Sequence, residues 1–182
     1  MSSYKRQAFS IAYCGIITAL AVITMFLSLV PSFAYAVPAL AGIVIWTVSQ
    51  HISAKWAYLC YAACGFISFM LVPEPEADLF YIFFFGYFPT LCDQLDKIKS
   101  KAVKFIMQLA IFNAAVVIAF NLTVLLMSAE EALEGMEDFG EYAVYFFWGF
   151  GNIAFLIYLF SLNYIKEAYI KVIKPRINAK LR

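Results

Sequence analysis

The sequence predicts an all-α polytopic membrane protein with six transmembrane helices and both the N and C termini in the cytoplasm. Three observations lead to this prediction: 64% of the 182 residues are apolar, only 14% are charged, and the charged residues are sorted between alternate loops. Soluble domains carry about 25% charged residues, and a soluble domain of this size has too little interior to bury so much apolar surface. We therefore expect a single membrane domain, residues 1–182, with lipid as the solvent for most of its surface.

Six apolar segments account for most of the chain. A helix needs about 20 mostly apolar residues to cross a bilayer, and none of the segments shows the alternation of a barrel strand. The first segment is not expected to be a signal peptide, because its apolar run is too long and it lacks a clear cleavage site. We expect the second to be interrupted near Pro38, the third to close at the turn from Pro73 to Pro75, and the short fourth to be kinked at Pro89. The expected spans cover residues 8–30, 35–48, 56–72, 79–91, 105–127 and 142–165.

The charges then fix the topology. With six spans, every Lys and Arg falls on one side of the membrane, whereas the loops 31–37, 73–78 and 128–141 hold nine acidic residues and no Lys or Arg. We expect the chain to lie in the cell membrane, and the positive-inside rule predicts that its basic side faces the cytoplasm. The basic tail, residues 166–182, is expected to be either a helix resting near anionic lipid heads or a solvated end.

Several functions are excluded because their chemistry is absent from the sequence. No ionisable residue falls near the middle of a predicted span, which argues against an ion-coupled transporter. No Walker A pattern, catalytic cluster or metal-ligand spacing occurs, so we expect neither an enzyme nor a metal or other cofactor. The lone His51 is interpreted as a surface residue and the four Cys as small apolar packing residues. A net charge of +1 gives no reason to expect nucleic acid as a partner.

Small residues form a stripe along the first span. Ala8, Ala12, Gly15 and Ala19 follow one another in steps of four, three and four, which places them on one face of a helix. In lipid, such a face allows another helix to approach closely. The pattern fits packing within the protein's own bundle and a surface for a partner equally well.

Aromatic and amide side chains suggest a ligand site in the outer half of the bundle. A pocket of aromatic rings with a few amides suits a flat apolar ligand, and an acidic rim of Glu74, Glu76 and Asp78 favours a cationic one. Three other origins stay open: an interfacial aromatic belt, amides that bond between helices, and acidity that follows from topology alone. The candidate ligand-binding residues are Glu74, Tyr81, Phe84, Phe85, Asn121, Tyr145, Trp148 and Asn152.

These features together resemble the substrate-binding S component of energy-coupling factor transporters, which are bacterial and archaeal importers of vitamins and other micronutrients. The segment Ala8-Phe-Ser-Ile-Ala12 matches the short Ala-x-x-x-Ala motif on the first helix of that family, and Gly15-Ile-Ile-Thr-Ala19 is a variant of it. The segment 16–22 and the loop from Pro31 to Pro38 are also similar to S components. No signature of a vitamin-specific subfamily occurs, so the substrate stays open.

The resemblance implies a mechanism without covalent chemistry. The chain would bind its ligand from outside, under a lid formed by the loops 31–37 and 73–78. It would dock through its first span on a transmembrane coupling subunit, topple in the membrane and release the ligand inward, while two ATPase subunits supply the energy. The alternative is a non-transport membrane partner or scaffold subunit of another complex, with a filled bundle and an exposed packing face.

Overall fold

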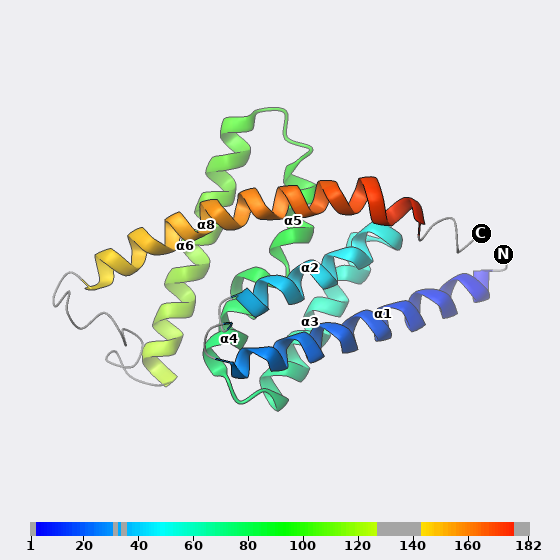
Figure 1. Ribbon diagram of the computed structural model, residues 1–182, viewed down its shortest axis with the longest axis horizontal. Coiled ribbons are helices and arrows are strands. Elements are labelled where there is room, and N and C mark those ends of the chain that lie inside the picture. Colours follow the sequence, from blue (N-terminus) through cyan, green and yellow to red (C-terminus); the bar gives the residue numbers. More distant parts are fainter. Residues whose placement is uncertain (1–2, 31–32, 34–35, 127–142, 177–182) are drawn as a thin grey trace. The chain divides into compact units, whose positions relative to one another are not determined.

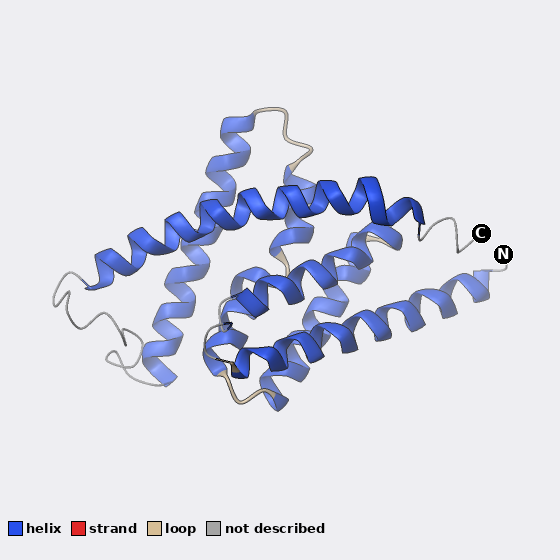
Figure 2. Cartoon of the chain, in the orientation of Figure 1, coloured by secondary structure: helices blue, strands red, loops and turns tan. Residues whose placement is uncertain are grey.

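A computed structural model describes residues 3–30, 33, 36–126 and 143–176 (Figure 1). Within these ranges every regular element is a helix and there is no strand, which confirms the predicted all-α class (Figure 2). The chain divides into two compact units, residues 1–122 and 123–182, and each is described by itself below. The predicted loop 128–141 and most of the predicted loop 31–37 lie outside the described residues.

The first unit contains five α-helical elements in sequence before the long α6. Helix α1 continues into a short 3-10 turn, η1. A π-helical turn, η3, follows α4 and precedes α5. The bounds are α1 Ser3–Met25, η1 Phe26–Leu29, α2 Ala36–His51, α3 Ala54–Leu71, α4 Pro75–Phe80, η3 Tyr81–Phe85, α5 Phe88–Leu95 and α6 Lys101–Leu126. The second unit contains α8, Ala143–Ala168, which continues into the π-helical turn η5, Tyr169–Ile173.

Four helical segments of the described chain are long and apolar enough to cross a membrane. They are Gln7–Leu29, Ala54–Leu71, Lys101–Leu122 and Trp148–Arg176. Helix α2 is apolar but shorter, and the predicted fourth span is divided among α4, η3 and α5. The membrane character predicted from composition is thus borne out by four helices, while six crossings and the placement of the termini stay predictions.

The prolines determine where two of these elements begin. Pro38 is the third residue of α2, within the first turn, where a missing N–H costs no helical hydrogen bond. The expected interruption is therefore the start of the helix. Pro89 is the second residue of α5 and cannot donate to the carbonyl of Phe85, four residues earlier. Just before α5 the chain forms the π-helical turn η3, which is closed by a hydrogen bond from the Gly86 N–H to the Tyr81 carbonyl at 2.8 Å.

Helices α1, α2 and α3 pack side by side and form the core of the first unit (Figure 1). The buried faces meet at small and medium side chains such as Ala21 and Met25 on α1, Ile45 on α2 and Cys64 on α3, all of them fully enclosed. In lipid such contacts stabilise by close van der Waals packing, since the surrounding hydrocarbon is as apolar as the side chains.

The basic tail begins as a continuation of α8. Residues 166–176 are helical, through η5 and one further turn. Lys171 forms an ion pair with Glu167, one turn away on this helix. Both side chains are exposed, so the pair adds little stability. The helical alternative predicted for this tail holds for the described part, and residues 177–182 lie outside it.

Candidate functional site

The small-residue stripe of α1 lies on the exposed side of the helix. Ala8, Ala12, Gly15 and Ala19 are all exposed, whereas the residues that α1 buries against its neighbours lie on another face. A Cβ atom built on Gly15 would meet no atom within 4 Å. These four residues are therefore not the ones that α1 uses to pack on α2 and α3.

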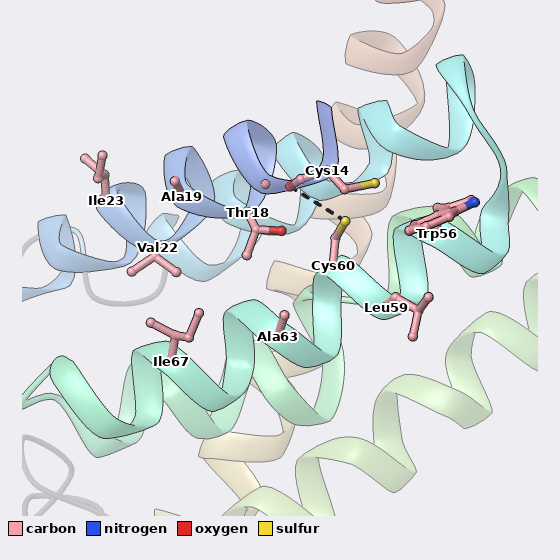
Figure 3. Close-up of a pocket in the computed structure, with 11 residues that line it drawn as sticks. Cys14, Thr18, Ala19, Val22, Ile23, Trp56, Leu59, Cys60, Ala63 and Ile67 are labelled. Carbon is pink, nitrogen blue, oxygen red and sulfur yellow. Dashed lines mark hydrogen bonds between the residues drawn. The ribbon is translucent and has the colours of Figure 1, made fainter. Parts of the chain in front are cut away.

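A groove between α1 and α3 opens beside this stripe (Figure 3). It has a volume of about 590 Å³, and Gly15 and Ala19 form part of its α1 wall. From α3, Cys60, Ala63 and Ile67 face the groove (Figure 3). The lining is almost wholly apolar, and the Cys60 thiol donates to the Cys14 carbonyl with the sulfur 3.9 Å from the oxygen. Such a surface suits an apolar helix or lipid chain.

The candidate ligand-binding aromatic residues on η3 pack into the core of the first unit. Tyr81 is fully buried and Phe84 almost so, while Phe85 is half-buried. The Tyr81 hydroxyl donates to the Tyr61 carbonyl at 3.5 Å. The Phe84 ring lies 4.3 Å from that of Phe88 and 5.2 Å from that of Phe112, between ring centroids. Phe84 thus packs among phenylalanine rings and Tyr81 packs against the ring of Tyr61, and none of the three candidates lines the groove between α1 and α3.

The π-helical turn is held by one side-chain hydrogen bond and two close glycine contacts. The Tyr61 hydroxyl donates to the Ile82 carbonyl at 2.6 Å, which satisfies a backbone group within the turn. A Cβ atom on Gly42 would lie 1.9 Å from the Phe85 carbonyl oxygen, and one on Gly86 would lie 2.5 Å from Cδ2 of Tyr61. Glycine at position 42 allows the backbones of α2 and η3 to come so close, and glycine at position 86 leaves room for the Tyr61 ring of α3. π-Helical turns of this kind are frequent at functional sites.

The two asparagines predicted to bind a ligand form side-chain hydrogen bonds within their own helices. The Asn121 side chain donates to the Val117 carbonyl at 2.7 Å, and that of Asn152 donates to the Trp148 carbonyl at 2.8 Å. This back-bonding to the preceding turn is a local solution open to short polar side chains. The sequence suggests two other roles for these amides, hydrogen bonding between helices or contact with a ligand, and the hydrogen bonds within each helix match neither.

The remaining aromatic candidates belong to the second unit. Tyr145 and Trp148 lie on α8 and are 75% and 43% exposed. Asn152 is one turn further along the same helix. A joint site of these residues with Tyr81, Phe84 and Asn121 of the first unit stays a prediction.

An acid that sequence analysis assigned to a solvated rim is buried. Asp78 on α4 is 1% exposed, and neither carboxylate oxygen has a hydrogen-bond partner among the described residues. Burial raises its pKa to about 6; the nearby Glu74 adds to the rise and Ser68 opposes it. Asp78 precedes the predicted fourth span, and an acid in a Pro- and Glu-rich loop looks solvated from sequence. Only the packing of α4 on α3 shows that it is enclosed.

A second acid, Asp93, links α5 to the C-terminal half of α2. Its Oδ2 accepts hydrogen bonds from Trp46 Nε1 at 2.7 Å, Gln50 Nε2 at 2.8 Å and Ser49 Oγ at 3.5 Å. Trp46 is fully buried, so its indole N–H needs such an acceptor. In the sequence Asp93 precedes four lysines between positions 97 and 104, and nothing in that pattern indicates the link to α2.

Comparison with known proteins adds no relative. No protein-family model matches the sequence, and neither a curated protein nor a solved structure matches the chain. The functional interpretation therefore depends on the residues and geometry described above.

Proposed function

We propose that this chain is the membrane-embedded substrate-binding subunit of an importer of the energy-coupling factor type. It captures a vitamin-like or other small organic micronutrient outside the cell and docks on a transmembrane coupling subunit that carries two ATPase subunits. One observation carries the proposal: the stripe Ala8, Ala12, Gly15 and Ala19, which contains the family's docking motif, is exposed and borders an apolar groove. Small residues let a partner helix approach closely in lipid, where association depends on such contacts.

The proposal includes six membrane crossings, with α2 as the second and the broken element from α4 to α5 as the fourth. The predicted fourth span, residues 79–91, lies within that element and rises roughly 20 Å at about 1.5 Å per residue, less than the hydrocarbon thickness of about 30 Å. The separation of all Lys and Arg from the nine external acids supports this count. Both termini then lie in the cytoplasm.

In this mechanism the chain binds and moves but does no covalent chemistry. The external loops 31–37 and 73–78 cover the ligand, and α1 presents the docking face. The partners supply the energy by ATP hydrolysis. Release of the ligand inward requires the subunit to reorient while it is held by the partner.

The test is purification of the tagged chain from its native membrane, followed by identification of the associated proteins. We expect a coupling subunit and ATPases with the wild type, and loss of both with Ala12→Trp or Ala19→Trp. Ala110→Trp is the matched control, because Ala110 is exposed on α6 and outside the stripe. Unchanged association in the stripe variants would contradict the docking assignment.

A second function, that of a non-transport membrane scaffold, is favoured by one observation. Tyr81 and Phe84 are enclosed in the core, as a filled bundle requires. The same purification separates the two functions, because a scaffold would retain a stoichiometric partner without an ATPase.

A further inference from the structure

Asp78 is a buried acid for which the described residues supply no positively charged partner. It is 1% exposed and both carboxylate oxygens are enclosed without a hydrogen bond. The Ser68 hydroxyl on α3 donates to the Gly65 carbonyl at 3.3 Å, and its interaction with the Asp78 carboxyl group only partly opposes the rise in pKa that burial causes. An ionised carboxylate is costly to bury unless a cation and hydrogen bonds compensate for the lost water. The site therefore requires either a bound proton or a cation.

The groups around Asp78 cannot supply that cation. Cys64 and Glu74 interact electrostatically with the carboxyl group, and both are neutral or acidic. Of the elements that contact α4, α2 and α3 carry basic residues only at their opposite ends, His51 and Lys55. Lys55 is 13 residues from Ser68, roughly 20 Å along the helix.

The external loops supply no cation either. The segments 31–37, 73–78 and 128–141 contain no Lys, Arg or His anywhere in the sequence. On the predicted outer side of the membrane, a positive charge for Asp78 must therefore come from another molecule. Glu74 and Glu76, on the same short segment, would raise the local concentration of cations there.

We propose that Asp78 is the counter-ion for the imported molecule, which carries an amine or another organic cation. This inference rests on the proposed function and names the substrate class for it. A carboxylate and an ammonium group form a charge-assisted hydrogen bond, about twice as strong as a neutral one.

The experiment measures which small molecules stay bound to the full chain. Wild type, Asp78→Asn and Glu167→Gln are purified from the native membrane at pH 7.5, and retained molecules are identified and quantified by mass spectrometry in both ion modes. Glu167→Gln removes an exposed acid remote from α4 in sequence and serves as the control. We expect wild type and control to retain the same organic cation, and Asp78→Asn at least tenfold less of it.

A pH wash of the wild type makes the test independent of the variant's folding. Protonation of Asp78 removes the negative charge, so washing at pH 4 should release at least nine tenths of the bound cation. Circular dichroism of Asp78→Asn should show an unchanged helix content. A neutral or anionic retained molecule, or a cation held equally by Asp78→Asn or at pH 4, would overturn the inference alone. A wild type that retains no small molecule would contradict the proposed function as well.

Discussion

Two glycines in neighbouring helices show opposite uses of a small residue. A Cβ atom on Gly15 of α1 would meet nothing within 4 Å, whereas one on Gly42 of α2 would lie 1.9 Å from the Phe85 carbonyl oxygen. Both belong to apolar helices and look alike in the sequence. Gly42 allows the backbone of η3 to approach within this chain, and Gly15 leaves a gap at the surface. Small residues can therefore serve either the protein's own packing or a partner, and the structure separates the two.

The largest effect is expected at Gly42. Gly42→Ala places a methyl group against a backbone carbonyl that cannot rotate away, so either α2 or η3 must shift. Overpacking of this kind costs about 1–3 kcal/mol or more. We expect a clear fall in the apparent Tm of the purified protein, measured by dye-based or light-scattering thermal unfolding. An unchanged Tm would break the comparison.

Gly15→Leu tests the other side of it. The side chain enters open space in the groove, and the helix gains because Leu has a better helix propensity than Gly. We expect an apparent Tm at or above that of the wild type, together with at least tenfold less co-purified partner. Ala110→Leu on α6 should change neither quantity. A strongly destabilised Gly15→Leu would mean that the groove is filled in the native protein.

Asp78 should make the stability of the ligand-free protein depend on pH. Its pKa in the folded state is raised from 3.8 to about 6, so the folded state holds the proton more tightly than the unfolded state. This contribution to stability is fully present below about pH 3.8 and is lost as pH rises through about 6. At about 1.36 kcal/mol per pKa unit, the rise from 3.8 to about 6 corresponds to a loss of about 3 kcal/mol.

The measurement is the apparent Tm of wild type and Asp78→Asn between pH 4 and pH 8. Asp78→Asn should lack the pH-dependent loss and be at least as stable as the wild type at pH 7.5. Parallel curves for the two proteins would show that Asp78 is not enclosed.

A smaller loss of stability than that of Gly42→Ala is expected for Tyr61→Phe. It removes the hydroxyl that donates to the Ile82 carbonyl at 2.6 Å and leaves a carbonyl of the π-helical turn unsatisfied, at a cost of about 1–2 kcal/mol. The apparent Tm should fall by a few degrees. Tyr164→Phe is the control, since Tyr164 is 69% exposed on α8. Equal shifts in the two variants would remove the role of Tyr61.

The helices were predictable because hydropathy reports directly on the solvent that a segment needs. The predicted spans 8–30 and 56–72 agree closely with the apolar segments Gln7–Leu29 and Ala54–Leu71. The break in the fourth segment was also predictable, because Pro89 cannot continue a regular helix.

The fate of individual side chains was not predictable. In lipid both faces of a helix are apolar, so the pattern does not say which aromatic residues turn inwards. Tyr81 and Phe84 are enclosed, whereas Tyr145 is 75% exposed. Asp78 looked solvated because its burial depends on how α4 packs on α3, which the composition of the loop does not show. The Asn121 side chain donates a hydrogen bond to a backbone carbonyl of its own helix, and the composition of the segment does not reveal this.

The most direct test of the central claim is the subunit composition of the native complex. Native mass spectrometry of the tagged chain, extracted from its own membrane in a mild detergent, measures that composition. The proposed function predicts a particle with one copy of this chain, one transmembrane coupling subunit and two ATPase subunits, and predicts that Gly15→Leu is recovered alone. A stoichiometric partner without any ATPase, or the same assembly with Gly15→Leu, would contradict the claim.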